Sequence, residues 1–301
     1  MNLPVSFPAP YPDEVLYSIL CRYHVRSCNQ SDNITLQQLF DKKRSLHTTV
    51  LSPFPLRFAS RWTDSFHGLS REALLLDHTA FPFYRAFYNC SNASRSSYAA
   101  DRFFMAMYNN CCTTSKRLRY CPKCAQAQWQ HLGVSYWQVL PQINGFEICP
   151  IHQELIRETH ITHWDIRYNF YPASDELGNP KSYENNWRTE WVLTHQKDFL
   201  QAALDISFLF RFSYYGFHLG AKIQKALQYD LLPIRHYWIR ELLNDPVAYY
   251  YDGTACLEAL AALARDQYQL ISQLQYIPVL LQLCLCRAMF GDLEEFCNAN
   301  L

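Results

Sequence analysis

Two short motifs contain the residues of this 301-residue chain whose types and spacing best fit a chemical role, Cys121-Pro-Lys-Cys124 and Cys149-Pro-Ile-His152. Each motif places two soft ligands three positions apart around a proline. A turn of this kind points both side chains at one metal ion, and Zn²⁺ takes four such ligands in a tetrahedron. We therefore predict a structural Zn²⁺ that is bound by Cys121, Cys124, Cys149 and His152.

Two other roles for such motifs remain as alternatives. A Cys-x-x-Cys pair can be a redox centre, but this interpretation requires a thioredoxin-like βαβ setting and leaves the second motif unexplained. A catalytic zinc keeps one coordination position open for water, and a zinc hydrolase would use a nearby carboxylate such as Glu147 or Glu154. Four protein ligands are available, which favours a closed site. Three further histidines lie near enough in sequence to replace one ligand: His131, His160 and His163.

The composition favours a folded, mainly helical protein. Hydrophobic residues make up 49% of the chain and charged residues 18%, which excludes an intrinsically disordered protein. The chain has eight glycines, and strand-and-turn folds rely on glycine for turns with positive φ. We predict a mainly α fold with an N-terminal helical domain, an embedded Cys₃His zinc module and a C-terminal helical bundle. The expected boundaries are 1–115, 116–160, a connector over 161–191, and 192–301.

Cysteine usage and apolar runs indicate the cellular setting. The chain has 12 cysteines, but it is too long for a small disulfide scaffold, and its first residues lack the pattern of a secretion signal. Its longest apolar run, 279–286, is far shorter than a membrane span. We expect a protein of the prokaryotic cytoplasm with reduced thiols and no membrane partner.

Charge is distributed unevenly although the formal net charge is zero. All charged residues between Asp101 and Glu147 are basic, whereas acids dominate from Asp245 to the end. Such asymmetry suggests phosphate contact by one half and protein contact by the other, although ordinary solvated faces would look the same. The candidate phosphate contacts beside the first motif are Lys116, Arg117, Arg119 and Lys123.

Helical periodicity places the motifs between two helical regions. Before the motifs, helices are expected from Asp13 as N-cap, over 35–40, over 53–66, after a Ser70 N-cap, and over 98–108. The aromatic run 78–88, which Pro82 interrupts, is interpreted as core packing. After the motifs, helices are expected over 192–212, 217–229, 234–243, 254–266 and 278–290.

One pair of these later helices has the length of a helix-turn-helix. The pair comprises 219–228 and 234–243, and the second helix contains side chains suited to phosphates or base edges. Packing within a bundle would explain such a pair equally well. The candidate DNA contacts in the second helix are Arg235, His236 and Arg240.

Several stretches resemble the TniQ/TnsD family of transposon target-site selection proteins. The opening run 7–18 is similar to the family's F-P-x-P-Y-x-x-E-x-x-Y-S start, and 78–84 is similar to its H-T-x-F-P-x-Y block. Residues 119–124, Tyr136-Trp137, Leu140-Pro141 and 149–152 resemble its zinc module. The resemblance is strong before about residue 155 and weak after it. The longer family members continue past this length, so the chain is expected to be an N-terminal part of such a selector or a short form.

The resemblance implies an adaptor and not an enzyme. Such a protein would bind target or attachment-site DNA, or an RNA-guided complex, and recruit an AAA+ ATPase regulator of the TnsC type. The chain has no G-x-x-x-x-G-K-[ST] loop, so a partner would have to bind the ATP. The alternative is a zinc-containing transcription regulator that binds DNA through 234–243 without an ATPase.

Overall fold

The computed structural model describes seven continuous parts of the chain: 7–40, 70–87, 117–162, 164–177, 187–212, 240–251 and 279–298. Five single residues are described besides these: Leu219, Lys222, Ile223, Lys225 and Glu258. The regular structure in these parts is mostly α-helix, with one two-stranded sheet, so the predicted mainly α fold is confirmed.

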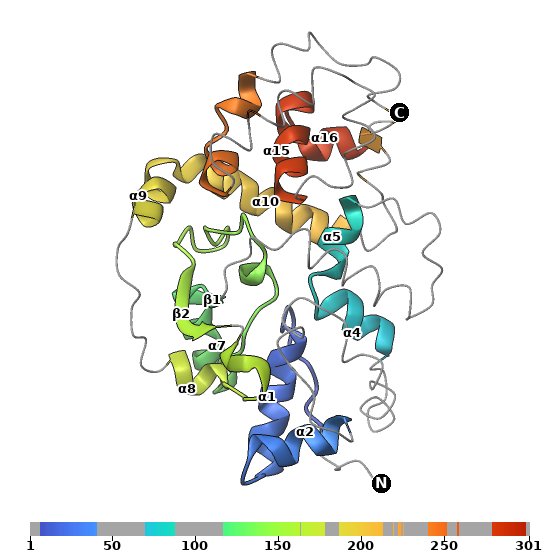
Figure 1. Ribbon diagram of the computed structural model, residues 1–301, viewed down its shortest axis with the longest axis vertical. Helices are drawn as coiled ribbons and strands as arrows, with labels where there is room; N and C mark the ends of the chain where they lie inside the picture. Colours follow the sequence, from blue (N-terminus) through green and yellow to red (C-terminus); the bar gives the residue numbers. More distant parts are fainter. Residues whose placement is uncertain are drawn as a thin grey trace.

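The elements follow one another in an order that places the sheet and the metal motifs between helices (Figure 1). The helices before the motifs are α1 (Leu16–Ser27), α2 (Asp32–Phe40), α4 (Arg71–Asp77) and α5 (Phe81–Phe87). The central elements are β1 (Arg117–Tyr120), α7 (Pro122–Leu132), the 3₁₀ turn η2 (Leu140–Gln142), β2 (Arg157–Thr162) and the 3₁₀ turn η3 (Asp165–Arg167). The later helices are α8 (Ala173–Leu177), α9 (Trp187–Thr194), α10 (Gln196–Phe212), α15 (Val279–Phe290) and α16 (Leu293–Asn298).

The small sheet joins the flanks of the two metal motifs. Strands β1 and β2 are antiparallel, with Arg119 opposite Glu158 and Tyr120 opposite Arg157, and the register is irregular between Arg117 and Arg119. Because β1 ends one residue before Cys121 and β2 begins five residues after His152, pairing of the strands brings the two motifs together.

Helix α10 connects the region of the sheet to the later helices. It crosses the middle of the molecule in Figure 1, between α7 and the sheet on one side and α15 and α16 on the other, and it packs against α5 and α16. Its buried face includes Phe199, Ala203, Ile206 and Leu209, which recur at helical spacing. These side chains belong to one hydrophobic cluster that extends from Phe7 to Cys297.

Several local predictions are confirmed and one is wrong. Ser70 caps α4 by accepting a hydrogen bond from the Ala73 backbone N at 3.0 Å, as expected. Asp13 does not cap α1, because its φ is +56° and the helix begins at Leu16 with Val15 as N-cap. The aromatic run packs in the core as predicted, and most of it is the helix α5, in which Pro82 occupies the first turn, where no intrahelical N–H is required.

The remaining sequence predictions fall partly outside the described residues. The helices expected over 53–66, 98–108 and 254–266 lie there almost entirely, and so does most of the candidate helix-turn-helix. The boundaries at 115, 160 and 191 stay predictions. Among the described residues, each helix is too short or too polar to cross a bilayer, and every cysteine is a free thiol.

Candidate metal centre

The first motif lies where a strand passes directly into a helix. Strand β1 ends at Tyr120, Cys121 is the N-cap of α7, and Pro122 takes the first helical position, where its fixed φ fits a helix start. Cys124 follows in the first turn, and the Ala125 backbone N donates to the Cys121 carbonyl at 3.0 Å. Both sulfurs therefore lie at a helix N-terminus, whose dipole favours thiolate over thiol.

The second motif is a tight turn closed by its own backbone. The Cys149 backbone N donates to the Glu154 carbonyl at 2.8 Å, and the Gln153 backbone N donates to the Cys149 carbonyl at 2.7 Å. Gln153 has a φ of +53°, which reverses the chain after His152. The turn points Cys149 and His152 in one direction.

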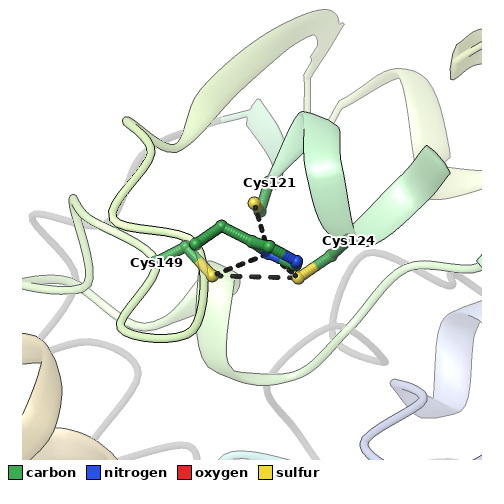
Figure 2. A group of neighbouring side chains, drawn as sticks. Cys121, Cys124 and Cys149 are labelled. Atoms are coloured by element: carbon green, nitrogen blue, oxygen red, sulfur yellow. Dashed lines mark hydrogen bonds between the residues drawn. The ribbon is translucent and has the colours of Figure 1, made fainter. Parts of the chain in front are cut away.

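The structure brings the four predicted ligands together. One ligand atom from each of Cys121, Cys124, Cys149 and His152 lies within 4.8 Å of the other three. The His152 Nδ1 atom is 3.6, 3.3 and 3.6 Å from the sulfurs of Cys121, Cys124 and Cys149, respectively, and the Cys124 and Cys149 sulfurs are 3.8 Å apart. Figure 2 shows the three labelled cysteines pointing at one common point.

These distances fit a tetrahedral zinc site. Zn–S bonds of about 2.3 Å and Zn–N bonds of about 2.0–2.1 Å imply edges of about 3.8 Å between two sulfurs and about 3.6 Å between sulfur and nitrogen. The four separations given above agree with these values to within about 0.3 Å, and the Cys121 sulfur lies within 4.8 Å of the other two sulfurs. The donor set and its geometry therefore fit Zn²⁺, and His152 would coordinate through Nδ1.

The protonation of the cluster would depend on a bound cation. The pKa of Cys149 is lowered, chiefly because the thiols of Cys121 and then Cys124 donate hydrogen bonds to its sulfur. The pKa of Cys124 is raised by its hydrogen bonds to Cys121 and Cys149 and then by burial. The protein alone therefore favours one thiolate in the cluster, whereas a divalent cation would favour all three.

The other candidate ligands and the two candidate carboxylates lie elsewhere. His131 and His160 are exposed and outside the cluster, and His163 is outside the described residues. Glu154 forms an H-x-E sequence with His152, a spacing that zinc deaminases use for their catalytic glutamate beside a metal with three protein ligands. Its carboxylate pairs instead with Lys123 Nζ at 2.7 Å, and the cluster already offers four ligand atoms, the number that a closed tetrahedral site requires.

Arg119, one of the predicted phosphate contacts, is buried. Its side chain is 1% exposed, and Nη2 donates to Glu147 Oε1 and to the Phe146 carbonyl, each at 2.7 Å. Burial opposes the guanidinium charge most strongly, but the Glu147 carboxylate, together with Tyr251 and Glu158, outweighs it, and the net pKa of Arg119 is raised. A guanidinium held in this way is not open to a DNA phosphate, so the role of Arg119 is corrected to a structural one.

The other candidate DNA contacts lie in different places. Lys123 is exposed on α7, and its ion pair with Glu154 raises the pKa of Lys123 and lowers that of Glu154. Arg117 is half-buried on β1, where Nη1 donates to the carbonyls of Thr159 and His160 at 3.3 and 3.2 Å. Arg240 is exposed. The remaining three candidates lie outside the described residues: Lys116, Arg235 and His236.

Sequence reasoning missed one basic residue beside the metal centre. Arg157 is exposed on β2 and lies opposite Tyr120, the residue that precedes Cys121. Arg157 follows Glu147 in sequence, so it lies outside the stretch 102–146, in which all charged residues are basic and which contains Lys123. The pairing of β1 with β2 places Arg157 there, and β2 is polar except for Ile161, so its sequence does not indicate that pairing.

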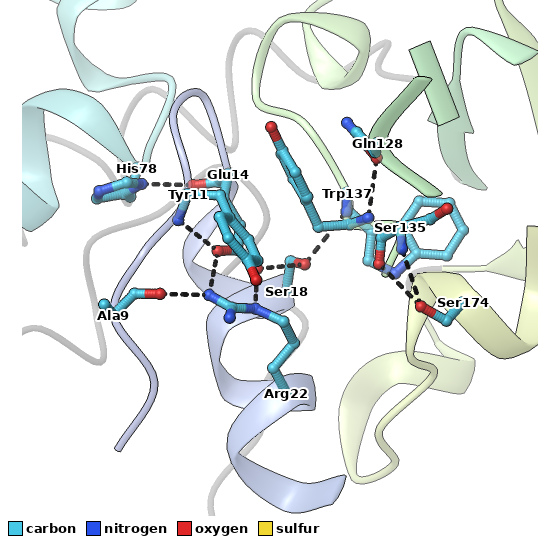
Figure 3. Close-up of polar contacts among 11 residues, drawn as sticks. Ala9, Tyr11, Glu14, Ser18, Arg22, His78, Gln128, Ser135, Trp137 and Ser174 are labelled. Atoms are coloured by element: carbon cyan, nitrogen blue, oxygen red, sulfur yellow. Dashed lines mark hydrogen bonds and ion pairs between the residues drawn. The ribbon is translucent and has the colours of Figure 1, made fainter. Parts of the chain in front are cut away.

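Glu14 is the centre of a buried network that joins the start of the described chain to the metal-binding region (Figure 3). Its carboxylate accepts hydrogen bonds from the Tyr11 backbone N at 2.9 Å, from Ser18 Oγ at 2.8 Å, and from Arg22 Nε and Nη2 at 2.8 and 2.6 Å. Glu14 is fully buried, and a buried charge requires such donors. Ser18 Oγ in turn accepts from the backbone N of Trp137, which lies between the two metal motifs.

The block at 78–84 is part of the same network. His78 Nδ1 is 2.6 Å from the Glu14 carbonyl oxygen, and because a carbonyl only accepts, Nδ1 carries the proton. The Leu16 backbone N donates to the His78 carbonyl at 2.8 Å, and the Val15 backbone N donates to the Trp137 carbonyl at 2.9 Å. These motif residues therefore brace the metal-binding region against α1.

Comparison with known proteins gives this arrangement a family. The TniQ family model matches residues 5–156, about half of the chain, a stretch that contains both metal motifs and the Glu14 network. The Transposon Tn7 transposition protein TnsD of Escherichia coli is 24% identical over 158 residues, which cover 50% of this chain and 31% of that protein. The chain thus spans about a third of the length of this relative. The matched residues and the Cys₃His cluster agree with the resemblance seen in the sequence, and the chain belongs to the TniQ family.

Proposed function

We propose that this chain is a non-catalytic target-site selector of a Tn7-type transposon. It would act in the prokaryotic cytoplasm, contact target DNA or a guide complex, and recruit an AAA+ ATPase regulator of the TnsC type. The single observation that carries the proposal is the TniQ match over 5–156, which includes the assembled metal cluster. The similarity to a transposition protein supports the same role.

The proposed cofactor is one structural Zn²⁺. A zinc with four protein ligands has no open position for water or substrate, so it stabilises a fold and does not activate a nucleophile. In this chain it would hold the N-terminus of α7 against the Cys149–His152 turn, at the end of the sheet. The metal would thereby fix the surfaces on both sides of the cluster in one geometry.

Basic side chains beside the cluster are the proposed DNA contacts. Lys123 on α7 and Arg157 on β2 are exposed, and both act on the charge of Glu154 next to the second motif. Phosphate contacts of this kind position a protein on DNA without reading its sequence. Arg117 and Lys116 would extend this surface along β1, and Arg235, His236 and Arg240 are proposed as a second DNA-contacting group.

Co-purification with the ATPase regulator tests the proposal. A TnsC-type AAA+ ATPase from the source organism, loaded with ATP, is expected to bind the purified chain in a pull-down and to be retained with it on duplex DNA. The experiment distinguishes the target-site selector from the transcription regulator. DNA binding without any binding of the ATPase would instead support the transcription regulator, and binding of neither would reject both functions.

A further inference from the structure

A cavity of about 700 Å³ lies between the second metal motif, α10 and the start of α16. Its apolar lining includes Ile151 at the tip of the Cys149–His152 turn, and Leu204 and Phe208 on α10. The two α10 residues are four positions apart, so they share one face of the helix. Ile151 is 77% exposed and Leu204 is 45% exposed, so large apolar side chains here face solvent.

The charged residues that line this cavity are mostly acidic. Four carboxylates and one guanidinium line it: Asp13, Asp205, Asp292, Glu294 and Arg211. Glu294 and Asp292 are exposed at the start of α16, and Asp13 precedes α1. The cavity therefore combines an apolar surface with net negative charge.

Asp205 shows that this negative charge is incompletely neutralised. Its side chain is 8% exposed, and Oδ1 accepts a hydrogen bond from Gln201 Nε2 at 3.0 Å. Within the described part of the chain, Oδ2 accepts no hydrogen bond, and the nearest cation, Arg287 Nε, is 3.6 Å away. Burial raises the pKa of Asp205. This carboxylate therefore adds negative charge that is only partly paired to the lining of the cavity.

We infer that this cavity, which we call the acidic groove, binds a segment of the ATPase regulator that presents an apolar side chain next to lysine or arginine. The inference rests on the proposed recruitment role and names the surface and the chemistry that would perform it. The apolar side chain would cover Ile151, Leu204 and Phe208, and the neighbouring cation would approach Asp205 and Glu294. Complementary charge of this kind orients a partner and speeds its encounter.

Other occupants fit the groove less well. A nucleic acid would bring phosphates towards four carboxylates, which is unfavourable. A metal cation would leave the apolar surface without a partner. Cys121, Cys124 and Cys149 also line the groove. A metal ion bound by these cysteines would therefore stabilise the groove and would not be its ligand.

Peptide binding to the full-length chain tests the inference. The probes are overlapping 15-residue peptides that cover the ATPase regulator, together with the intact ATPase. We expect the binding peptides to contain Leu, Ile or Phe beside Lys or Arg, and their affinity to fall with added salt. The double variant Leu204→Ser/Glu294→Gln should weaken both peptide and ATPase binding by about tenfold or more, the scale of a hot-spot loss.

A matched variant controls for changes of the surface in general. Leu193→Ser/Glu295→Gln removes an exposed leucine and an exposed glutamate that do not line the groove, and it should change affinity by less than about twofold. Metal content and circular dichroism establish that both double variants are folded.

The outcomes distinguish this inference from the proposed function. If the groove variant binds the ATPase as tightly as the wild type, the groove assignment is overturned and the recruitment role stands. If the wild type binds no ATPase, both are overturned. Self-association that depends on Leu204, combined with unchanged ATPase binding, would assign the groove to a second copy of the chain and reject the inference.

Discussion

Arg119 and Glu147 form a buried ion pair that joins the two metal motifs two residues before the first cysteine of each. Arg119 Nη2 is 2.7 Å from Glu147 Oε1, and Cys121 and Cys149 follow these residues at the same offset. Tyr251 also donates a hydrogen bond to Glu147 and accepts one from the Gly145 backbone N at 2.8 Å. The ion pair thus supports the metal-binding backbone on one side and contacts the helical region after α10 on the other.

Removal of one partner should destabilise the fold strongly. Arg119→Ala would leave the Glu147 carboxylate with the Tyr251 hydroxyl but without a counter-charge in a buried site. Loss of one member of a buried pair costs about 3–5 kcal/mol. We expect a decrease of this size in the free energy of unfolding, measured by urea titration of the zinc-loaded protein.

Lys123→Ala is the matched control for this measurement. It removes a cation from an exposed pair with Glu154, where solvent screens the interaction. The urea midpoint of Lys123→Ala should stay close to that of the wild type. Equal midpoints for Arg119→Ala and Lys123→Ala would show that the buried pair does not support the metal-binding region.

Removal of the metal should unfold the region around the sheet. A structural zinc contributes its binding free energy to folding, so Cys121→Ser should both lose the metal and lower the thermal midpoint. Elemental analysis is expected to find one zinc per wild-type chain and much less in Cys121→Ser. Cys28→Ser changes an exposed cysteine outside the cluster and should retain the full metal content. A Cys121→Ser protein with native stability and no zinc would contradict a structural role.

The Cys₃His cluster could be predicted from the sequence because its chemistry is local. Two ligands three positions apart around a proline form a half-site by themselves, and the sequence had only to contain two of them. Arg119 could not be placed in the same way. Its charge suggested DNA contact, but burial and a partner at position 147 depend on the tertiary fold.

The secondary-structure predictions also divide into those that depend on local chemistry and those that depend on the tertiary fold. Ser70 as N-cap and the core packing of the described part of the aromatic run, 78–87, follow from local chemistry and from the size of the aromatic side chains, and both agree with the structure. Strands β1 and β2 were missed because the alternation of β1 covers only four residues, Arg-Leu-Arg-Tyr, and β2 is polar except for Ile161, so it has no alternation that would identify it as the partner. Asp13 was misassigned because it lies in a turn that aligns Glu14, whose buried network the linear sequence does not show.

Gly145 should tolerate a methyl group far less well than Gly133. Both have positive φ, +90° and +69°, which costs an alanine about 1–2 kcal/mol. A Cβ at Gly145 would also lie 2.6 Å from Leu280 Cδ1 and 2.9 Å from Ile206 Cδ1, whereas nothing lies within 4 Å at Gly133. Leu280 and Ile206 are buried, so accommodating the methyl group lowers the free energy of unfolding further by about 1–3 kcal/mol, the cost of overpacking a core.

Urea titrations of the two alanine variants measure this difference. Gly145→Ala should have the lower urea midpoint. Gly133→Ala should lose only the stability that a positive φ costs an alanine. Equal losses would mean that Leu280 and Ile206 move aside without cost, and that α10 and α15 pack less tightly on the metal-binding region than the structure indicates.

Charge reversal beside the metal centre should weaken DNA binding in a salt-dependent way. Lys123→Glu/Arg157→Glu replaces two exposed cations that flank the sheet, and each phosphate contact contributes about 0.9 to the slope of log affinity against log salt. We expect the double variant to bind a 30-base-pair duplex more weakly and to have a slope smaller by about two. Fluorescence anisotropy over a range of salt concentrations measures both quantities. Arg26→Glu/Lys197→Glu, which reverses two exposed bases on α1 and α10, makes the same change of net charge and should leave the slope nearly unchanged. A double variant with the wild-type slope would exclude Lys123 and Arg157 as phosphate contacts, and DNA contact would then have to come from other residues, such as the group around Arg240.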